Sequence, residues 1–237
     1  MNAGRVFRTQ RTVGLSDVDV DGRLRLDVVA RFLQDAASED VIDVGRPPSR
    51  HFWVVRRTEL DVVEPFRDDL RVELVTWASG TAPTAASRRY TLRGDAGGHI
   101  EAESIWIHLD RDLRPLRLDD GFLEIYGESA AGRRASTRLT LPPPQVAPSR
   151  EWPLRVTDVD RLGHVNNAAY WAPFEEIFAG RLGGRLRAVL EYRKPIDLGE
   201  RVELAVDGDH LWLLVDGDVR SAAWLDPDGA RDPEQLA

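Results

Sequence analysis

The sequence predicts an α+β protein made of two homologous halves, each with one helix followed by an antiparallel sheet. Three observations support this prediction: an internal repeat, apolar residues at helical spacing after each copy of an aspartate-rich turn, and strand-like runs after each helix. The chain has 237 residues, of which 42% are hydrophobic and 30% are charged. Such a composition is typical of a globular protein with a buried core.

The internal repeat consists of two pairs of matching segments. Ser16-Asp-Val-Asp-Val-Asp-Gly22 matches Thr157-Asp-Val-Asp-Arg-Leu-Gly163 at an offset of 141 residues. Further along the chain, Asp61–Leu74 resembles Glu191–Leu204 at an offset of 130 residues. Because both matches keep their order and only the spacing shrinks, we interpret the chain as a duplication with a shorter second copy.

Each half contains one segment with the apolar spacing of an amphipathic helix. The apolar residues are Leu26, Val29, Ala30, Leu33 and Ala37 in the first half, and Tyr170, Phe174, Ile177 and Phe178 in the second. Pro173 should either kink the second helix or require it to begin close to Tyr170, because proline lacks the N–H that a helix interior needs.

Strand-like segments follow each predicted helix, bounded by turn residues. In the first half they are Phe52–Val63, Leu70–Trp77, Thr84–Arg93 and His99–Asp110, and in the second they are Arg187–Pro195, Arg201–Val206, Leu211–Val215 and Val219–Leu225. The two sheets can pair edge to edge or pack face to face as a pseudo-dimer. The predicted organisation is an N-terminal half over residues 1–127, a Pro-rich linker over 128–150 and a C-terminal half over 151–237.

The composition excludes several classes of function. The chain has no cysteine, which rules out disulfides, thiolate metal ligands and a cysteine nucleophile. The five histidines show no metal-ligand spacing, so no metal is expected. A net charge of −8 argues against nucleic-acid binding. The longest apolar run, Leu211–Val215, is far too short for a membrane span, and the N-terminus lacks a secretory signal, so we expect a cytoplasmic protein.

The segment before the second helix carries the residues best suited to chemistry. Gly163 permits a tight turn, and Asn166 or Asn167 can cap the helix, leaving backbone N–H groups for a ligand oxygen. Asp160 can activate water or attack an electrophile, and His164 lies four residues further on. The same residues would also suit a purely structural turn and cap, and spacing alone does not separate the two interpretations.

The stretch Asp160-Arg-Leu-Gly-His-Val-Asn-Asn-Ala-Ala-Tyr170 resembles the Asp-x-x-Gly-His-Val-Asn-Asn-x-x-Tyr signature of hot-dog-fold thioesterases. Four other segments, Phe32-Leu-Gln-Asp-Ala-Ala37, Trp53-Val-Val-Arg56, Val75-Thr-Trp-Ala-Ser-Gly80 and Ala102-Glu-Ser-Ile-Trp-Ile-His-Leu-Asp110, resemble the acyl-ACP thioesterases. The resemblance implies a double hot-dog fold and hydrolysis of fatty acyl-ACP to a free fatty acid and holo-ACP. Acyl carrier protein would be the partner, and no cofactor would be needed.

The resemblance also implies roles for individual residues. Asp160 matches the family's catalytic aspartate, acting as general base or alternatively as nucleophile, and His164 matches its histidine. The helix N–H groups would stabilise the oxyanion. The expected substrate-binding residues are Asn166, Asn167 and Tyr170, and the acyl chain would lie in the apolar space around the first helix. Two positions depart from the family pattern: Leu162 replaces an asparagine, and Pro195 replaces a glutamate.

An acidic carrier protein would need a local positive patch on this acidic chain. Arg185 and Arg187 are the expected docking residues, within a cluster of basic residues that follows the second helix. Two alternatives to the acyl-ACP hydrolase are an acyl-CoA thioesterase and a non-catalytic acyl-binding protein of the same fold. Chain length and oligomeric state, with a homodimer among the alternatives, do not follow from these patterns.

Overall fold

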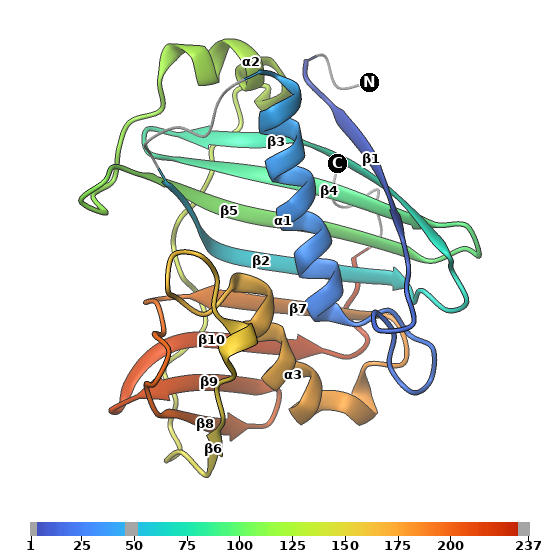
Figure 1. Cartoon of the computed structure of the whole chain (residues 1–237), viewed down its shortest axis with the longest axis vertical. Coiled ribbons are helices and arrows are strands. Elements are labelled where there is room, and N and C mark those ends of the chain that lie inside the picture. The colour runs from blue at the N-terminus through green and yellow to red at the C-terminus, as the bar shows by residue number, and fades with distance from the viewer. Residues whose placement is uncertain (1–3, 46–51, 232–237) are drawn as a thin grey trace.

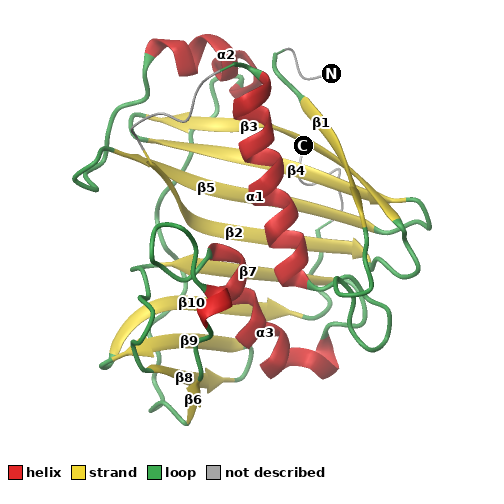
Figure 2. Cartoon of the chain, viewed as in Figure 1, coloured by secondary structure: helices red, strands yellow, loops and turns green. Residues whose placement is uncertain are grey.

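The structure is a computed structural model that describes residues 4–45 and 52–231 (Figure 1). Its main feature is a single antiparallel sheet with helices on one face (Figure 2). The strand order is β1-β3-β4-β5-β2-β7-β10-β9-β8-β6, so the strands of the first half are contiguous and meet those of the second half at β2 and β7. The residues at the outer limits of the two predicted halves, 1–3 and 232–237, lie outside the described residues.

The strands are β1 (Phe7–Thr12), β2 (Phe52–Glu64), β3 (Arg71–Ala82), β4 (Ala85–Gly94), β5 (His99–Leu109), β6 (Arg150–Trp152), β7 (Leu186–Tyr192), β8 (Val202–Asp207), β9 (His210–Val215) and β10 (Asp218–Asp226). The helices are α1 (Leu26–Asp43), α2 (Asp120–Ala130) and α3 (Trp171–Phe178). Short 3₁₀ turns cover Val156–Asp158, Asn167–Tyr170 and Ala179–Arg181. Within the described ranges, no helix is long and apolar enough to cross a membrane.

The two helices predicted from apolar spacing are present. α1 buries Leu26, Val29 and Leu33 against the sheet. The second helix begins as a 3₁₀ turn and becomes α-helical at Trp171, which places Pro173 in the first α-helical turn. Proline is tolerated there because N–H groups of a first turn have no intrahelical partner. The expectation that this helix begins close to Tyr170 is confirmed.

β2 and β7 join the two halves edge to edge. They pair antiparallel from Arg57 opposite Glu191 to Val62 opposite Leu186, with Glu59 opposite Val189. Glu59 and Val189 are 130 residues apart, which is the offset of the second repeat match, so a pseudo-twofold axis passes through this pair. The register at the seam agrees with the offset of the repeat, and the strands pair edge to edge in one sheet instead of packing face to face.

Acidic and basic side chains meet at the seam on the sheet face away from the helices. Glu59 accepts from Arg57 at 2.7 Å, from Arg187 at 2.8 Å and from Arg231 at 2.9 Å. Burial alone would raise the pKa of Glu59, but the guanidinium groups, Arg57 first, outweigh burial and hold that pKa below its usual value. Glu59 is therefore ionised at neutral pH and draws three arginines onto the pairing of β2 with β7.

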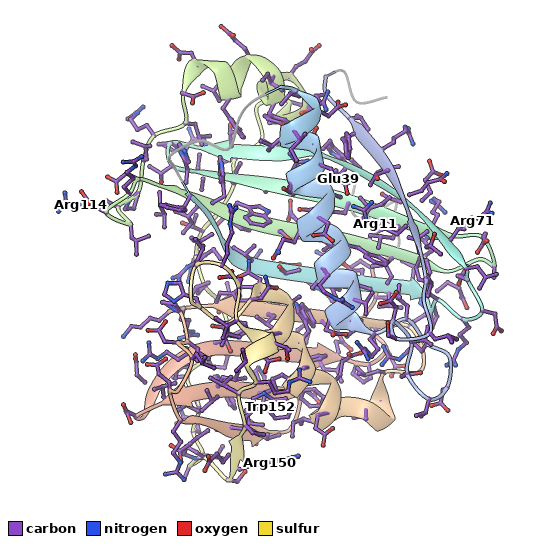
Figure 3. All side chains as sticks on the ribbon, viewed as in Figure 1. Arg11, Glu39, Arg71, Arg114, Arg150 and Trp152 are labelled. Carbon is purple, nitrogen blue, oxygen red and sulfur yellow. The ribbon has the colours of Figure 1, made fainter. Side chains whose placement is uncertain are left out.

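The apolar core lies between the sheet and the helices and is continuous across the seam. Side chains of α1, such as Val29, and of α3, such as Phe174, belong to one buried cluster with Leu60 of β2 and Leu190 of β7. At the far edge of the first half, α1 is tied to β1 by an ion pair between Arg11 and Glu39 at 2.8 Å (Figure 3).

Three elements were not expected from the sequence: β1, β6 and α2. β1 and β6 are edge strands, and their sequences, Phe-Arg-Thr-Gln-Arg-Thr and Arg-Glu-Trp, are mainly polar and do not alternate apolar with polar residues. α2 is capped by Asp119, whose carboxylate accepts the Phe122 N–H at 2.6 Å, and it overlaps the first residues of the linker expected over 128–150.

The rest of the linker crosses the outer face of the sheet. The Thr140 N–H donates to Glu191 at 2.6 Å, and the Trp212 indole N–H donates to the Pro142 carbonyl at 2.8 Å. Leu141 packs between these bonds against a small apolar cluster that includes Trp212. The linker is thus part of the packed structure and covers the second half of the sheet.

We expect Glu59→Gln to lower the free energy of unfolding by about 2 kcal/mol near neutral pH, because it removes a carboxylate shared by partly buried guanidinium groups. Since the pKa of Glu59 is lowered by folding, its contribution is present above the ordinary carboxyl pKa and is lost as the pH falls through the folded-state value. Thermal unfolding from about pH 7 to about pH 3 should show the gap between wild type and variant closing in acid.

Glu73→Gln is the matched control, because Glu73 pairs with Arg8 at 3.4 Å and both side chains are at least half exposed. An exposed pair of this kind contributes less than about 0.5 kcal/mol. Equal destabilisation by the two substitutions would contradict the role given to Glu59.

Candidate active site

The turn before the second helix is held by backbone hydrogen bonds. The Asp160 N–H donates to the His164 carbonyl at 2.9 Å, and the Gly163 N–H donates to the Asp160 carbonyl at 3.0 Å. A third bond, from the Asn166 N–H to the Asp158 carbonyl at 2.8 Å, closes the loop. Gly163 has a φ of 85°, which only glycine adopts without strain, and this turn places Asp160 and His164 opposite each other.

The turn before α1 has the same construction but different side-chain chemistry. The Asp19 N–H donates to the Arg23 carbonyl at 2.9 Å, and the Gly22 N–H donates to the Asp19 carbonyl at 3.1 Å. Here Arg23 stands where the repeat places His164, and its Nε lies 2.9 Å from the Asp19 carboxylate. The first copy of the aspartate is therefore neutralised by its own turn.

The Asp160 carboxylate has no such partner. It accepts the backbone N–H of Leu162 at 2.8 Å, and no cation of the described residues lies within ion-pair distance of it. Because that donor is a backbone group, a leucine at position 162 preserves it, and the Leu162 side chain is 47% exposed. Asp160 thus has an oxygen lone pair available for a proton, as a general base requires.

His164 has a carboxylate partner that the sequence did not reveal. Its Nδ1 lies 2.5 Å from Oδ1 of Asp197, on the loop after β7, and the two backbones form an isolated bridge. The Asp197 N–H donates in turn to Glu200 at 2.7 Å, which fixes the loop. A carboxylate on one ring nitrogen orients a histidine and leaves the other nitrogen for a substrate or water. One feature of the sequence could have pointed to Asp197 as the partner of His164. It is an acidic residue two positions after Pro195, and Pro195 itself occupies the position of the family's glutamate.

The remaining predicted substrate-binding residues lie in three different environments. The Asn166 side chain caps the 3₁₀ turn by accepting the Ala168 N–H at 2.9 Å. Asn167 lines a pocket. Tyr170 is buried in the core, where its ring packs edge-on against Tyr192, and burial raises its pKa. Of these three residues, Asn167 alone lines the pocket. Asn166 caps the turn that carries Asn167, and Tyr170 is part of the core.

The pocket lies at the seam between the halves and holds about 240 Å³ of empty space, its open mouth included. It is bounded by α1, β2, β5, β7 and the start of the second helix. The lining residues are Ala30, Leu33, Gln34, Val55, Thr58, Ser104, Trp106, Asn167 and Tyr192. Apolar and polar side chains are mixed, which is typical of a site that holds an apolar ligand and also fixes its orientation.

The two predicted docking arginines differ in their surroundings. Arg185 is exposed, and its guanidinium contacts the carbonyl oxygens of Val63 and Ala230 at 3.4 Å and 3.2 Å. Arg187 is a strand residue of β7 with 26% of its side chain exposed, and it pairs with Glu59 at the seam. Of the two, Arg185 is the more accessible to an acidic partner.

Comparison with known proteins identifies the family. A model of the acyl-ACP thioesterase N-terminal domain matches residues 4–126, and a model of the C-terminal domain matches residues 143–211. The chain belongs to the acyl-ACP thioesterase family. As a member of this family it is a thioester hydrolase. Two uncharacterized proteins of Mycobacterium tuberculosis are 35% identical over 232 residues, which cover 94% of this chain and 93% of each relative.

Solved structures of the family share the fold at low sequence identity. An acyl-ACP thioesterase from Bacteroides thetaiotaomicron superposes with a TM-score of 0.76 at 18% identity, covering 93% of this chain and 98% of that one. A 12:0-ACP thioesterase from Umbellularia californica gives 0.75 at 19% identity, covering 93% and 96%. These neighbours have a hot-dog-like fold, in agreement with the sheet and helices of this acyl-ACP thioesterase family member.

Because Asp197 orients His164, we expect Asp197→Ala to lower kcat for thioester hydrolysis about tenfold or more, with a smaller effect on KM. The matched control is Asp209→Ala, since Asp209 also forms one surface ion pair, with Arg181 at 2.5 Å. Steady-state kinetics on one acyl thioester compare the two variants. Unchanged kcat in Asp197→Ala would show that the contact has no part in the reaction.

Proposed function

We propose that this protein hydrolyses fatty acyl-ACP to a free fatty acid and holo-ACP in the cytoplasm. Two tandem hot-dog halves, residues 1–127 and 151–237 with the linker 128–150 between them, would provide the scaffold. The observation that carries the proposal is the difference between the two copies of the turn. Asp19 forms an ion pair with Arg23. Asp160 forms no ion pair with any residue that the structure describes, and it lies opposite His164. The second half is therefore the catalytic one.

In the proposed reaction the thioester carbonyl lies at the start of the second helix. Backbone N–H groups and the helix dipole there stabilise the oxyanion as it forms. Asp160 removes a proton from water, whose oxygen attacks the carbonyl carbon. The tetrahedral intermediate then collapses, the C–S bond breaks, and the departing pantetheine thiolate takes up the proton. His164, oriented by Asp197, positions the water or donates a hydrogen bond to the leaving sulfur.

We expect Asp160→Asn to lower kcat about 100-fold or more, the scale usual for the loss of a general base. Asp19→Asn is the control, because the repeat places it at the same point of the same turn. That variant should keep its kcat and lose some thermal stability, since it weakens the contact with Arg23. Released thiol can be assayed on short, medium and long acyl-ACPs. If Asp19→Asn abolishes turnover and Asp160→Asn does not, the active site lies in the first half.

The carrier proposal depends on charge. Acyl carrier protein is acidic, so docking on a chain of net charge −8 requires a local cation. We expect Arg185→Glu to raise KM for acyl-ACP at least about threefold and to weaken its dependence on salt, while KM for the matching acyl-CoA stays the same. Arg114→Glu is the control, because Arg114 lies at another end of the sheet and is 78% exposed (Figure 3).

Faster hydrolysis of acyl-CoA than of the matching acyl-ACP would favour the acyl-CoA thioesterase alternative. A change in kcat alone in Arg185→Glu would argue against docking at this residue. Arg187 is unsuitable for this test, because reversing its charge also breaks the pairing with Glu59.

A further inference from the structure

The pseudo-twofold axis relates two equivalent regions at the seam. In each region the first residues of one helix lie against the side of the other helix. The 141-residue offset equates Leu26, the first residue of α1, with Asn167, the first residue of the second helix. By the same offset, Gln34 of α1 corresponds to Glu175 of α3. One of these two regions is a cleft filled by side chains, and the other is a cleft that contains the seam pocket.

The cleft at the start of α1 is closed by the protein's own side chains. Glu175 accepts the Leu26 N–H at 2.8 Å and a guanidinium N–H of Arg23 at 2.9 Å. Both charged side chains are largely buried. Trp171, which the repeat equates with Ala30, is 0% exposed and belongs to the core. An ion pair and an indole therefore take the space that a ligand would need.

The cleft at the start of the second helix is open because the corresponding residues differ. Ala30 replaces the indole with a methyl group, and Gln34 replaces the carboxylate with a neutral amide. His164 stands in the position of Arg23 but points its Nδ1 to Asp197. Together these changes leave the seam pocket, with Gln34 and Asn167 on its wall.

The wall of this pocket offers hydrogen-bonding groups to a ligand. The hydroxyls of Thr58 and Ser104 are buried and lie 3.3 Å apart. The side-chain amides of Gln34 and Asn167 make no hydrogen bond with any residue that the structure describes. A plain hydrocarbon chain would displace water from these groups and leave them unpaired, which is unfavourable.

We propose that the seam pocket selects a short acyl chain that carries a hydroxyl or keto oxygen close to the thioester. Gln34, Thr58 and Ser104 are the specificity-determining residues, and they receive that oxygen. The pocket is small, which favours a short chain over a long one. This inference rests on the proposed thioesterase function and names the substrate class of the same site.

Matched thioesters test the proposal: butanoyl- against 3-hydroxybutanoyl-ACP, and hexanoyl- against 3-hydroxyhexanoyl- and 3-oxohexanoyl-ACP. We expect kcat/KM to be about tenfold or more higher for the oxygenated member of each pair, because a site built to bind an oxygen discriminates against a chain that lacks it. The chain has no cysteine, so released thiol can be measured directly. Gln34→Leu and the double variant Thr58→Val/Ser104→Ala should each bring the ratio close to one. Gln10→Leu, on the exposed side of β1, should preserve it.

A wild-type ratio of one or below overturns the proposal without the need for any variant. A high ratio that survives both Gln34→Leu and the double variant overturns the assignment of these residues. If no thioester of any kind is cleaved, the proposed function fails, and calorimetry then tests the pocket separately. In that case 3-hydroxyhexanoyl-pantetheine must bind more tightly than hexanoyl-pantetheine, and equal affinities would refute the inference.

Discussion

The antiparallel pairing of β2 with β7 is the constraint on which the rest of the structure depends. It joins two sheets into one and places α1 and α3 on the same face (Figure 1). Opposite charges face each other symmetrically across it, with Arg57 opposite Glu191 and Asp61 opposite Arg187. A shift of one residue would turn the side chains of β2 to the wrong face and move the charged residues into the core. The cluster around Glu59 thus helps to define the register.

This register also brings each helix start to the flank of the other helix. The protein uses the two resulting clefts differently. At the start of α1, Glu175 and Arg23 form a largely buried ion pair that also satisfies the Leu26 N–H. Such a pair costs desolvation energy but fixes a geometry. At the start of the second helix the described residues form no equivalent pair, and a pocket remains. The two copies of the turn therefore stand beside two different clefts, one filled by an ion pair and one that contains a pocket.

The candidate site departs from the family pattern at two positions, and the structure offers a physical account of both. At position 162 the contact to Asp160 comes from the backbone N–H, which any residue except proline supplies. At position 195 the proline removes a side-chain carboxylate, but Asp197 on the same loop reaches His164. The imidazole of His164 therefore has a carboxylate partner although position 195 is a proline. Function lies in such side-chain geometry and not in the fold alone.

The sequence by itself determined the features that depend on local spacing. The aspartate turns, the start of the second helix close to Tyr170 and most strands could be predicted, because each is encoded in residues close together. The internal repeat is a direct match between two segments of the chain. The short edge strands β1 and β6 could not be predicted, since edge strands need little apolar alternation to form.

Only the tertiary structure decided which side chains meet across the sheet and the seam. His164 and Asp197 are 33 residues apart, Leu26 and Glu175 are 149 apart, and Arg187 and Glu59 are 128 apart. These contacts depend on the register of strands whose order in the sheet differs from their order in the chain. Side-chain periodicity defines which face a residue occupies but not its neighbour on the next strand. For this reason the partner of His164 and the pocket beside Gln34 emerged only from the folded chain.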